Sequence, residues 1–201
     1  MMFLHRHSKT GNVAADGAIA SRLNRDDGGR SAPDYERGKT MKPNIGMTDK
    51  DRDGVVKALT ALLADEYVLY TKTRNYHWNV VGPHFSDLHK FFESQYEELD
   101  DIVDEVAERA RAVGGHAIGT LQEFTQHARV KEHPAHYPAS REMIGDLLGD
   151  HETIIRQLRE DVQMTAEQYH DVGTSDFLTG ILEQHEKMGW MLRANLEGQS
   201  I

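Results

Sequence analysis

The sequence contains no cysteine, which excludes both disulfide bonds and thiolate metal ligands. A metal site in this chain would therefore use histidine, aspartate and glutamate. No stretch approaches the roughly 18 consecutive apolar residues that span a bilayer. The apolar run at the start is too short for a signal peptide, and basic residues follow it rather than precede it. These absences predict a cytoplasmic protein, with no membrane partner and one sizeable core.

Positive charge is scarce outside the N-terminal segment. The net charge is −10, from 23 Lys and Arg against 33 Asp and Glu. Residues 1–48 hold eight of the basic and five of the acidic residues, which leaves 15 basic and 28 acidic residues, or −13, for the rest. A body this acidic repels nucleic acid and attracts cations. Only the N-terminal segment favours DNA electrostatically.

The first 48 residues differ in composition from the rest. They are rich in Gly, Ser, Asp, Asn and Arg and show no sustained apolar period, so residues 1–48 are predicted to be a flexible N-terminal extension. Met41 and Met47 leave a second possibility, in which the true start lies there and the first forty residues are a gene-model artefact. Residues 49–201 are predicted to form one domain.

From Thr48 onward, apolar residues recur at helical spacing. Helices are predicted at about 49–78, 86–113, 140–170 and 174–196, with Thr48 and Ser140 as caps and Thr174 or Ser175 opening the last. No strand signal is present, so an all-α four-helix bundle is predicted. The segment between the second and third long helices carries its own short helix, near 121–127. This length favours a crossover connection over a hairpin.

Five residues are candidate metal ligands: His77, His89, Glu93, Asp104 and Glu108. The last four form two pairs, each four residues apart, so each pair projects from one face of a helix. The pairs start fifteen residues apart, or about 22 Å along a helix, too far to share one ion within a chain. If two copies of this helix cross antiparallel near Leu99, the first pair of one chain faces the second pair of the other. An isologous dimer would then contain two identical sites.

From spacing alone, a simpler interpretation stays open. The run EELDDIVDEVAER is also typical of a solvated acidic helix face. His77, beside Trp78, could equally be a core histidine with a satisfied hydrogen bond.

Residues 75–115, NYHWNVVGPHFSDLHKFFESQYEELDDIVDEVAERARAVGG, resemble the signature region of the Dps family of miniferritins, within the ferritin-like superfamily. The shared features are HWN, a second histidine twelve residues on, and the DE-x-AER ending before GG. The stretches DLLGDHETIIRQLR and DFLTGILEQHEKMGWMLRANLEG are similar to that family's third and fourth helices. The resemblance covers about residues 50–198.

The resemblance implies a hollow dodecamer that oxidises Fe(II), preferably with hydrogen peroxide, and stores a ferric mineral. Carried over by position, the ferroxidase ligands fall on the five candidate residues named above. Trp78 would act as a radical sink, although packing is an equal alternative. Asp171 and Asp176 flank the turn where the family has its iron-entry pores. Their alternative roles are those of turn and first-turn helix residues.

Two functions from different classes therefore compete. The first is a ferroxidase that stores iron, and the second is a protein that condenses and protects DNA. The extension has only two lysines before Met41, interspersed with five acids, which weakens the DNA hypothesis.

Ordinary ferritins use paired E-x-x-H motifs, and here only Glu167 and His170 match. Further metal binding remains open at two sets of histidines: the loop residues His127, His133 and His136, and His5 and His7 of the extension.

Overall fold

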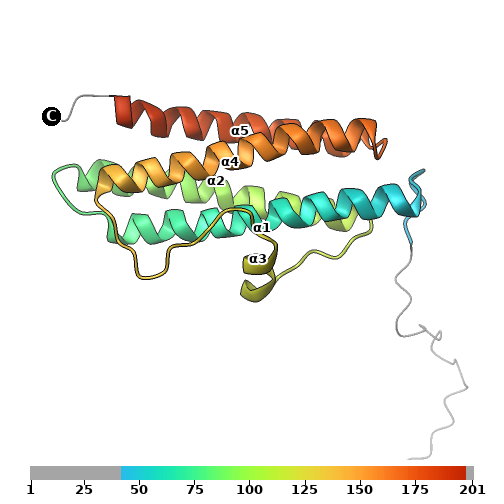
Figure 1. Cartoon of the computed structure of the whole chain (residues 1–201), viewed down its shortest axis with the longest axis horizontal. Coiled ribbons are helices and arrows are strands. Elements are labelled where there is room, and N and C mark those ends of the chain that lie inside the picture. Colours follow the sequence, from blue (N-terminus) through green and yellow to red (C-terminus); the bar gives the residue numbers. More distant parts are fainter. Residues whose placement is uncertain (1–41, 198–201) are drawn as a thin grey trace, which may run out of the picture. The chain divides into compact units, whose positions relative to one another are not determined.

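The computed structural model describes residues 42–197, which fold into five α-helices. These are α1 (Asp49–Asn79), α2 (Phe85–Ala112), α3 (Leu121–His127), α4 (Ser140–Glu167) and α5 (Val172–Glu197), shown in Figure 1. No strand occurs within residues 42–197. The predicted all-α bundle, with a short extra helix between its second and third long helices, is confirmed. Of the predicted extension, residues 1–41 lie outside the described residues, as do His5 and His7.

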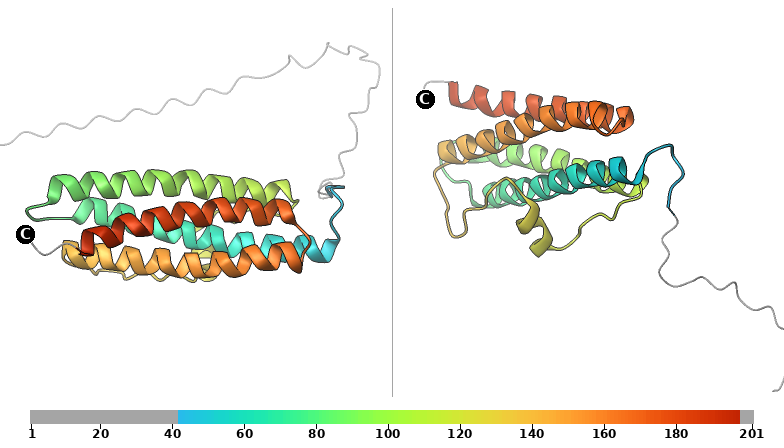
Figure 2. Two further views of the ribbon diagram at one scale, coloured as in Figure 1. Left: turned by 90° about the horizontal axis from the view of Figure 1, so that it is seen from above. Right: turned by 45° about the vertical axis from the view of Figure 1, so that its right-hand side comes forward.

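The four long helices form two antiparallel hairpins, α1 with α2 and α4 with α5 (Figure 2). The segment between α2 and α4 runs back along the bundle, so that α2 and α4 point in the same direction (Figure 1). This is the predicted crossover. Apolar side chains from all four long helices fill the space between the hairpins, including Leu59, Phe92, Leu147 and Leu178, each at most 1% exposed. None of the helices in the described part of the chain is long and apolar enough to cross a membrane.

The crossover is held against α1 by a buried carboxylate and an aromatic stack. Asp65 accepts a hydrogen bond from Arg129 Nε at 2.6 Å and another from the Val130 backbone N–H at 3.0 Å. On α3, the Phe124 ring stacks on Tyr67 with 4.1 Å between centroids. Because both contacts fix the long connection to α1, the outward face of α2 stays uncovered within one chain.

Two helix boundaries follow the sequence signals closely. The Thr48 hydroxyl accepts the Asp51 backbone N–H at 3.2 Å, as its predicted role as the cap of α1 requires. Beyond the C-terminus of α2, Gly114 has a φ of +94°, a conformation that favours glycine. The position of Gly114 directly after the helix is thus explained by backbone geometry.

The starts of the last two long helices differ from the prediction. Ala139 occupies the N-cap position of α4, and Ser140 is already helical and makes no capping hydrogen bond. Helix α5 begins at Val172 rather than at Thr174 or Ser175, because the Asp171 carboxylate accepts the Thr174 backbone N–H at 3.0 Å. Aspartate is a strong N-cap residue, and it moves the helix start two residues earlier.

Candidate metal centre

Helix α2 has an apolar face turned inward and an acidic face turned outward. Its buried residues are Leu88, Phe92, Gln95, Leu99, Ile102, Val106 and Ala110. A helix turns by about 100° per residue, so His89, Glu93, Asp104 and Glu108 fall within an arc of about 100°. The centre of that arc lies roughly 150° around the helix axis from the row of buried residues. Asp104 and Glu108 are exposed, and His89 and Glu93 are half-buried. All four candidate ligands on α2 therefore lie on the face that this chain does not pack.

His77, near the C-terminus of α1, and His89, in the second turn of α2, form a reciprocal pair. His77 Nδ1 lies 2.7 Å from the backbone oxygen of His89, and His89 Nδ1 lies 2.9 Å from that of His77. Their rings stack with 3.7 Å between centroids and 20° between planes. The last carbonyls of a helix lack helical partners, so the His77 oxygen is available for this bond. The two bonds fix both rings against the turn between α1 and α2.

These bonds determine which nitrogen of each ring can bind a metal. A carbonyl oxygen only accepts, so Nδ1 must carry the hydrogen in both rings. In the neutral imidazole, Nε2 is then left with a free lone pair. Histidines that bind metals through one nitrogen commonly donate the other N–H to a carbonyl in this way. The pair is thus arranged as two neutral nitrogen donors.

Tyr96 joins the histidine pair to Glu93. Its ring packs edge-on against His77 with 5.2 Å between centroids, and its hydroxyl lies 3.4 Å from Glu93 Oε1. Desolvation raises the pKa of Tyr96, and the neighbouring Glu93 carboxylate raises it further, so the hydroxyl keeps its proton and can donate to Glu93. The Arg74 guanidinium lies 4.9 Å above the Tyr96 ring centroid. These contacts hold Tyr96 beside the candidate ligands.

One chain supplies only parts of a site. His77, His89 and Glu93 lie near one end of α2, and Asp104 and Glu108 lie about 22 Å along the helix, counting about 1.5 Å per residue. Among residues 42–197, no three His, Asp or Glu side chains surround a common point that could hold an ion. The five predicted ligands thus form one cluster of three residues and a separate pair of carboxylates.

Comparisons with known proteins identify the family. A family model described as a ferritin-like domain matches residues 56–199. A low temperature-induced protein of Nostoc sp. is 48% identical over 158 residues, covering 79% of this chain and 88% of that protein. DNA protection during starvation protein 2 of Bacillus anthracis is 37% identical, covering 71% and 96% respectively. The crystal structure of Dps from Vibrio cholerae has a TM-score of 0.73 at 31% identity, covering 79% of this chain and 99% of that one. The chain belongs to the Dps family of ferritin-like proteins.

Trp78, the predicted radical sink of this Dps chain, directly follows His77 in sequence but points outward. It is 66% exposed, and the Arg74 guanidinium lies 5.4 Å from its ring centroid. So exposed a side chain contributes little to the packing of a single chain. Both alternatives, radical chemistry and packing, stay predictions.

The two aspartates that the Dps resemblance placed at an entry pore have different surroundings. Asp171 is only 9% exposed, lies 3.3 Å from Arg109 Nη2 and caps α5 through Thr174. Asp176, in the first turns of α5, is exposed. The Asp171 carboxylate is therefore already paired within the chain, whereas that of Asp176 is free to face solvent. The pore role of either residue stays a prediction.

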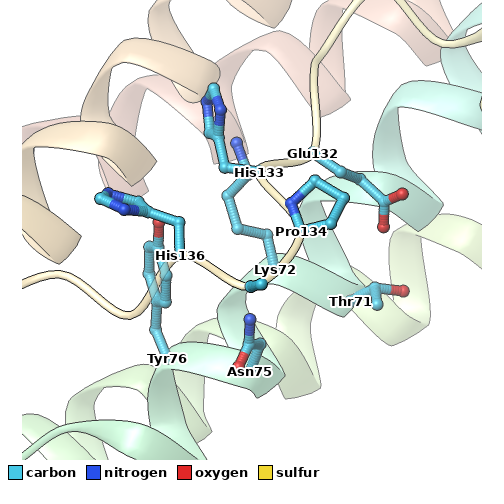
Figure 3. A pocket seen from close by; sticks show the side chains of 9 residues that line it. Thr71, Lys72, Asn75, Tyr76, Glu132, His133, Pro134 and His136 are labelled. Atoms are coloured by element: carbon cyan, nitrogen blue, oxygen red, sulfur yellow. The ribbon is translucent and has the colours of Figure 1, made fainter.

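Two of the three loop histidines of this Dps chain line a cavity between the crossover and α1. His133 and His136 border a space of about 270 Å³ that also contacts Lys72 and Tyr76 (Figure 3). Their ring centroids are 6.3 Å apart, and His136 Nε2 lies 3.4 Å from Glu142 Oε1. Metal binding here stays a prediction, as it does for His127 at the end of α3.

Sequence reasoning missed Tyr96 and a buried cluster of Glu66, His151 and His185. Tyr96 could have been found, because it lies seven residues after His89 and therefore on the same face two turns later. The buried cluster has no local signal. Its three members come from three helices, and only the packing of the bundle brings them together.

Proposed function

We propose that this protein oxidises Fe(II) at dinuclear sites shared between two subunits and stores the ferric product inside a hollow dodecameric shell. Membership of the ferritin-like Dps family supports iron storage and protection in general. The Vibrio cholerae relative is described as a member of a superfamily of ferritin-like diiron-carboxylate proteins. Iron is substrate and cargo here, and imidazole nitrogens with carboxylate oxygens are suitable ligands for it.

The division of the candidate ligands into two separated groups carries this proposal. An isologous interface places the same patch of both chains face to face. If the outward faces of two α2 helices cross antiparallel near their midpoints, the histidine end of one helix meets Asp104 and Glu108 of the other. Each dimer then completes two equal sites, and each site has three ligands from one chain and two from its partner.

Two irons held side by side match the chemistry of hydrogen peroxide. Each Fe(II) gives up one electron, and one peroxide molecule takes up both as its O–O bond breaks to yield two hydroxides. A single iron would transfer one electron and release a hydroxyl radical. The carboxylates of Glu93, Asp104 and Glu108 add negative charge that favours the ferric product, while the histidines provide neutral donors. Peroxide is therefore the proposed oxidant.

Entry of iron is proposed to use the acidic turn between α4 and α5. Three copies of the exposed Asp176 around a threefold axis would raise the local concentration of cations. Asp171 would act there mainly by holding the turn in shape through Arg109. The shell is proposed to reside in the cytoplasm.

DNA protection is the second candidate, and the name of the Bacillus anthracis relative favours it. Electrostatics opposes it, because residues 49–201 carry a net charge of −13 and the basic excess lies in residues 1–48. A gel-shift assay at low and moderate salt would separate the two functions. Binding through the extension must weaken as the salt concentration rises.

Anaerobic titration with Fe(II), followed by peroxide, tests the proposal. Two dinuclear sites per dimer predict saturation at about two Fe(II) per chain, and about one peroxide consumed for every two irons oxidised. Failure to bind Fe(II) stoichiometrically would contradict the site. Consumption of one peroxide per iron, with trapped hydroxyl radical, would contradict the paired two-electron reaction.

A further inference from the structure

Three tyrosine rings lie in contact with one another, starting beside the candidate iron site and ending in the middle of α1. The Tyr96 ring packs edge-on against that of His77 with 5.2 Å between centroids, and the Tyr96 hydroxyl lies 3.4 Å from Glu93 Oε1. The Tyr70 ring meets that of Tyr96 edge-on at 6.2 Å, and the Tyr67 ring follows at 5.9 Å. Centroid separations of about 4.5–7 Å are those of aromatic rings in direct contact. The row of rings therefore connects the proposed ligands to a point farther along α1.

A site that holds a single Fe(II) can give hydrogen peroxide one electron only. The O–O bond then breaks into a hydroxide and a hydroxyl radical. Irons arrive one at a time, so singly occupied sites occur whenever the protein is being loaded. A phenol close to the iron can supply the missing electron, because tyrosine gives up one electron and its hydroxyl proton together. Tyr96 is in such a position, since it contacts two of the proposed ligands directly.

We propose, on the basis of the function proposed above, that Tyr96 gives peroxide the second electron when the site holds one iron, and that Tyr70 and Tyr67 carry the resulting radical away. Fe(II), hydrogen peroxide and Tyr96 yield Fe(III), one hydroxide, one water and a neutral tyrosyl radical. The O–O bond breaks, the iron and the phenol each lose one electron, and both electrons end on the peroxide oxygens. The hydroxyl proton of Tyr96 leaves along its hydrogen bond to Glu93 and converts one of the two hydroxides into the water.

Arg74 gives this row of rings a direction. Its guanidinium lies 4.9 Å from the Tyr96 centroid and 5.4 Å from the Tyr70 centroid, and Arg74 Nη1 donates to the Tyr70 hydroxyl. Tyr67 lies farther from Arg74 on α1, at about 10 Å along the helix axis. A positive charge over a ring makes the removal of an electron harder, and this effect weakens with distance. The radical is therefore most stable on Tyr67, which is also the last ring of the row counted from the iron.

Each transfer along the row moves one electron and one proton, so each ring that the radical leaves recovers its hydroxyl. All three tyrosines are half-buried, which allows water to carry the protons. The Tyr67 ring stacks on that of Phe124 with 4.1 Å between centroids, and a phenyl ring without a hydroxyl is much harder to oxidise. The radical therefore stops at Tyr67, away from His77 and Glu93, which it would otherwise damage.

Freeze-quenched electron paramagnetic resonance of the assembled, full-length protein tests this proposal. Fe(II) is added anaerobically well below saturation, so that most occupied sites hold one iron, and one peroxide per iron follows. We expect an organic radical whose hyperfine splitting collapses when the protein is grown with ring-deuterated tyrosine. Tyr96→Phe should remove this signal and raise the yield of trapped hydroxyl radical. Tyr67→Phe should alter the splitting, because the radical then rests on a different ring. Tyr137→Phe, at an exposed position in the crossover, is the matched control and should leave the signal unchanged.

Full loading with iron separates this proposal from the iron site itself. At about two Fe(II) per chain both electrons come from iron, so the radical yield per iron should fall. Under these conditions Tyr67→Phe should oxidise Fe(II) at the unsubstituted rate. Normal oxidation at full loading, combined at low loading with no tyrosyl signal, with a signal that tryptophan labelling assigns to Trp78, or with one that Tyr96→Phe leaves in place, would overturn the radical transfer alone. Failure of the unsubstituted protein to bind or oxidise Fe(II) would overturn both this proposal and the proposed function.

Discussion

Two pairs of histidines in this Dps family member show how position decides what the same side chain can do. His77 and His89 each bond through Nδ1 to a backbone oxygen, which leaves both Nε2 atoms free beside an acidic, unpacked face. His151 and His185 instead face each other through Nδ1 in a core with no exposure to solvent. In the first pair, the His77 oxygen is available because it lies in the last turn of α1, and the turn between α1 and α2 brings it to His89. Both members of the second pair lie in mid-helix.

Replacing His89 or Asp104 by alanine tests the outward pair and should give the largest effect. Each change removes a proposed ligand, so we expect Fe(II) oxidation to slow by more than about tenfold, measured by stopped-flow absorbance of the ferric product. Neither residue is part of the buried core, so light scattering should show an unchanged particle. His116→Ala, at an exposed position, serves as control. Normal rates in both variants would remove these residues from the site.

Replacing Glu66 by leucine tests the core pair and should affect stability instead. The variant would leave a buried ring nitrogen of His185 without its hydrogen-bond partner, at a cost of about 1–3 kcal/mol in the free energy of unfolding. Denaturant titration measures the loss. Glu160→Leu, on the exposed side of α4, should change stability by less than about 0.5 kcal/mol. Equal effects of the two substitutions would show that Glu66 has no special role in the core.

Acid should distinguish the core pair further. The folded-state pKa of His151 lies well below its ordinary value of 6.5, so below about pH 6.5 the unfolded chain binds a proton that the folded chain does not. Stability must therefore fall as pH decreases from about 6.5, by about 1.4 kcal/mol per pH unit, until the folded-state pKa is reached. His151→Phe should flatten this slope. An unchanged slope would exclude His151 as its source.

The acidic turn should give the smallest effects and separates charge from structure. Asp176→Asn should slow iron uptake at low Fe(II) and low salt, and added salt should narrow the difference because it screens the same field. Asp171→Asn should chiefly reduce stability, by about 1 kcal/mol or more, since it weakens the helix cap and the bond to Arg109. Uptake of iron at the normal rate by Asp176→Asn under these conditions would remove it from the entry route.

The features that sequence could predict are those with a local period. The four long helices, the short helix in the crossover and the outward row from His89 to Glu108 all follow from helical spacing. The start of α5 could not be predicted as well, because Asp171, Thr174 and Ser175 are all capable N-caps. The structure selects Asp171, whose carboxylate also reaches Arg109 on α2.

Features that depend on packing escaped the sequence. His77 and His89 were both candidates, but their reciprocal bonds and the free Nε2 atoms require the exact turn between α1 and α2. The core cluster joins residues as far apart as Glu66 and His185. Spacing along one helix carries no information about such contacts.

Sharing of each iron site between two chains is the central claim, and mixed shells test it most directly. Subunits with His89→Ala and subunits with Asp104→Ala are assembled together in equal amounts, and Fe(II) oxidation is compared with that of each variant alone. A dimer of one of each has one doubly damaged site and one intact site, so random pairing should restore about a quarter of all sites and of the unsubstituted activity. If activity stayed at the level of the single variants at every mixing ratio, each chain would carry its own complete site and the shared centre would be wrong.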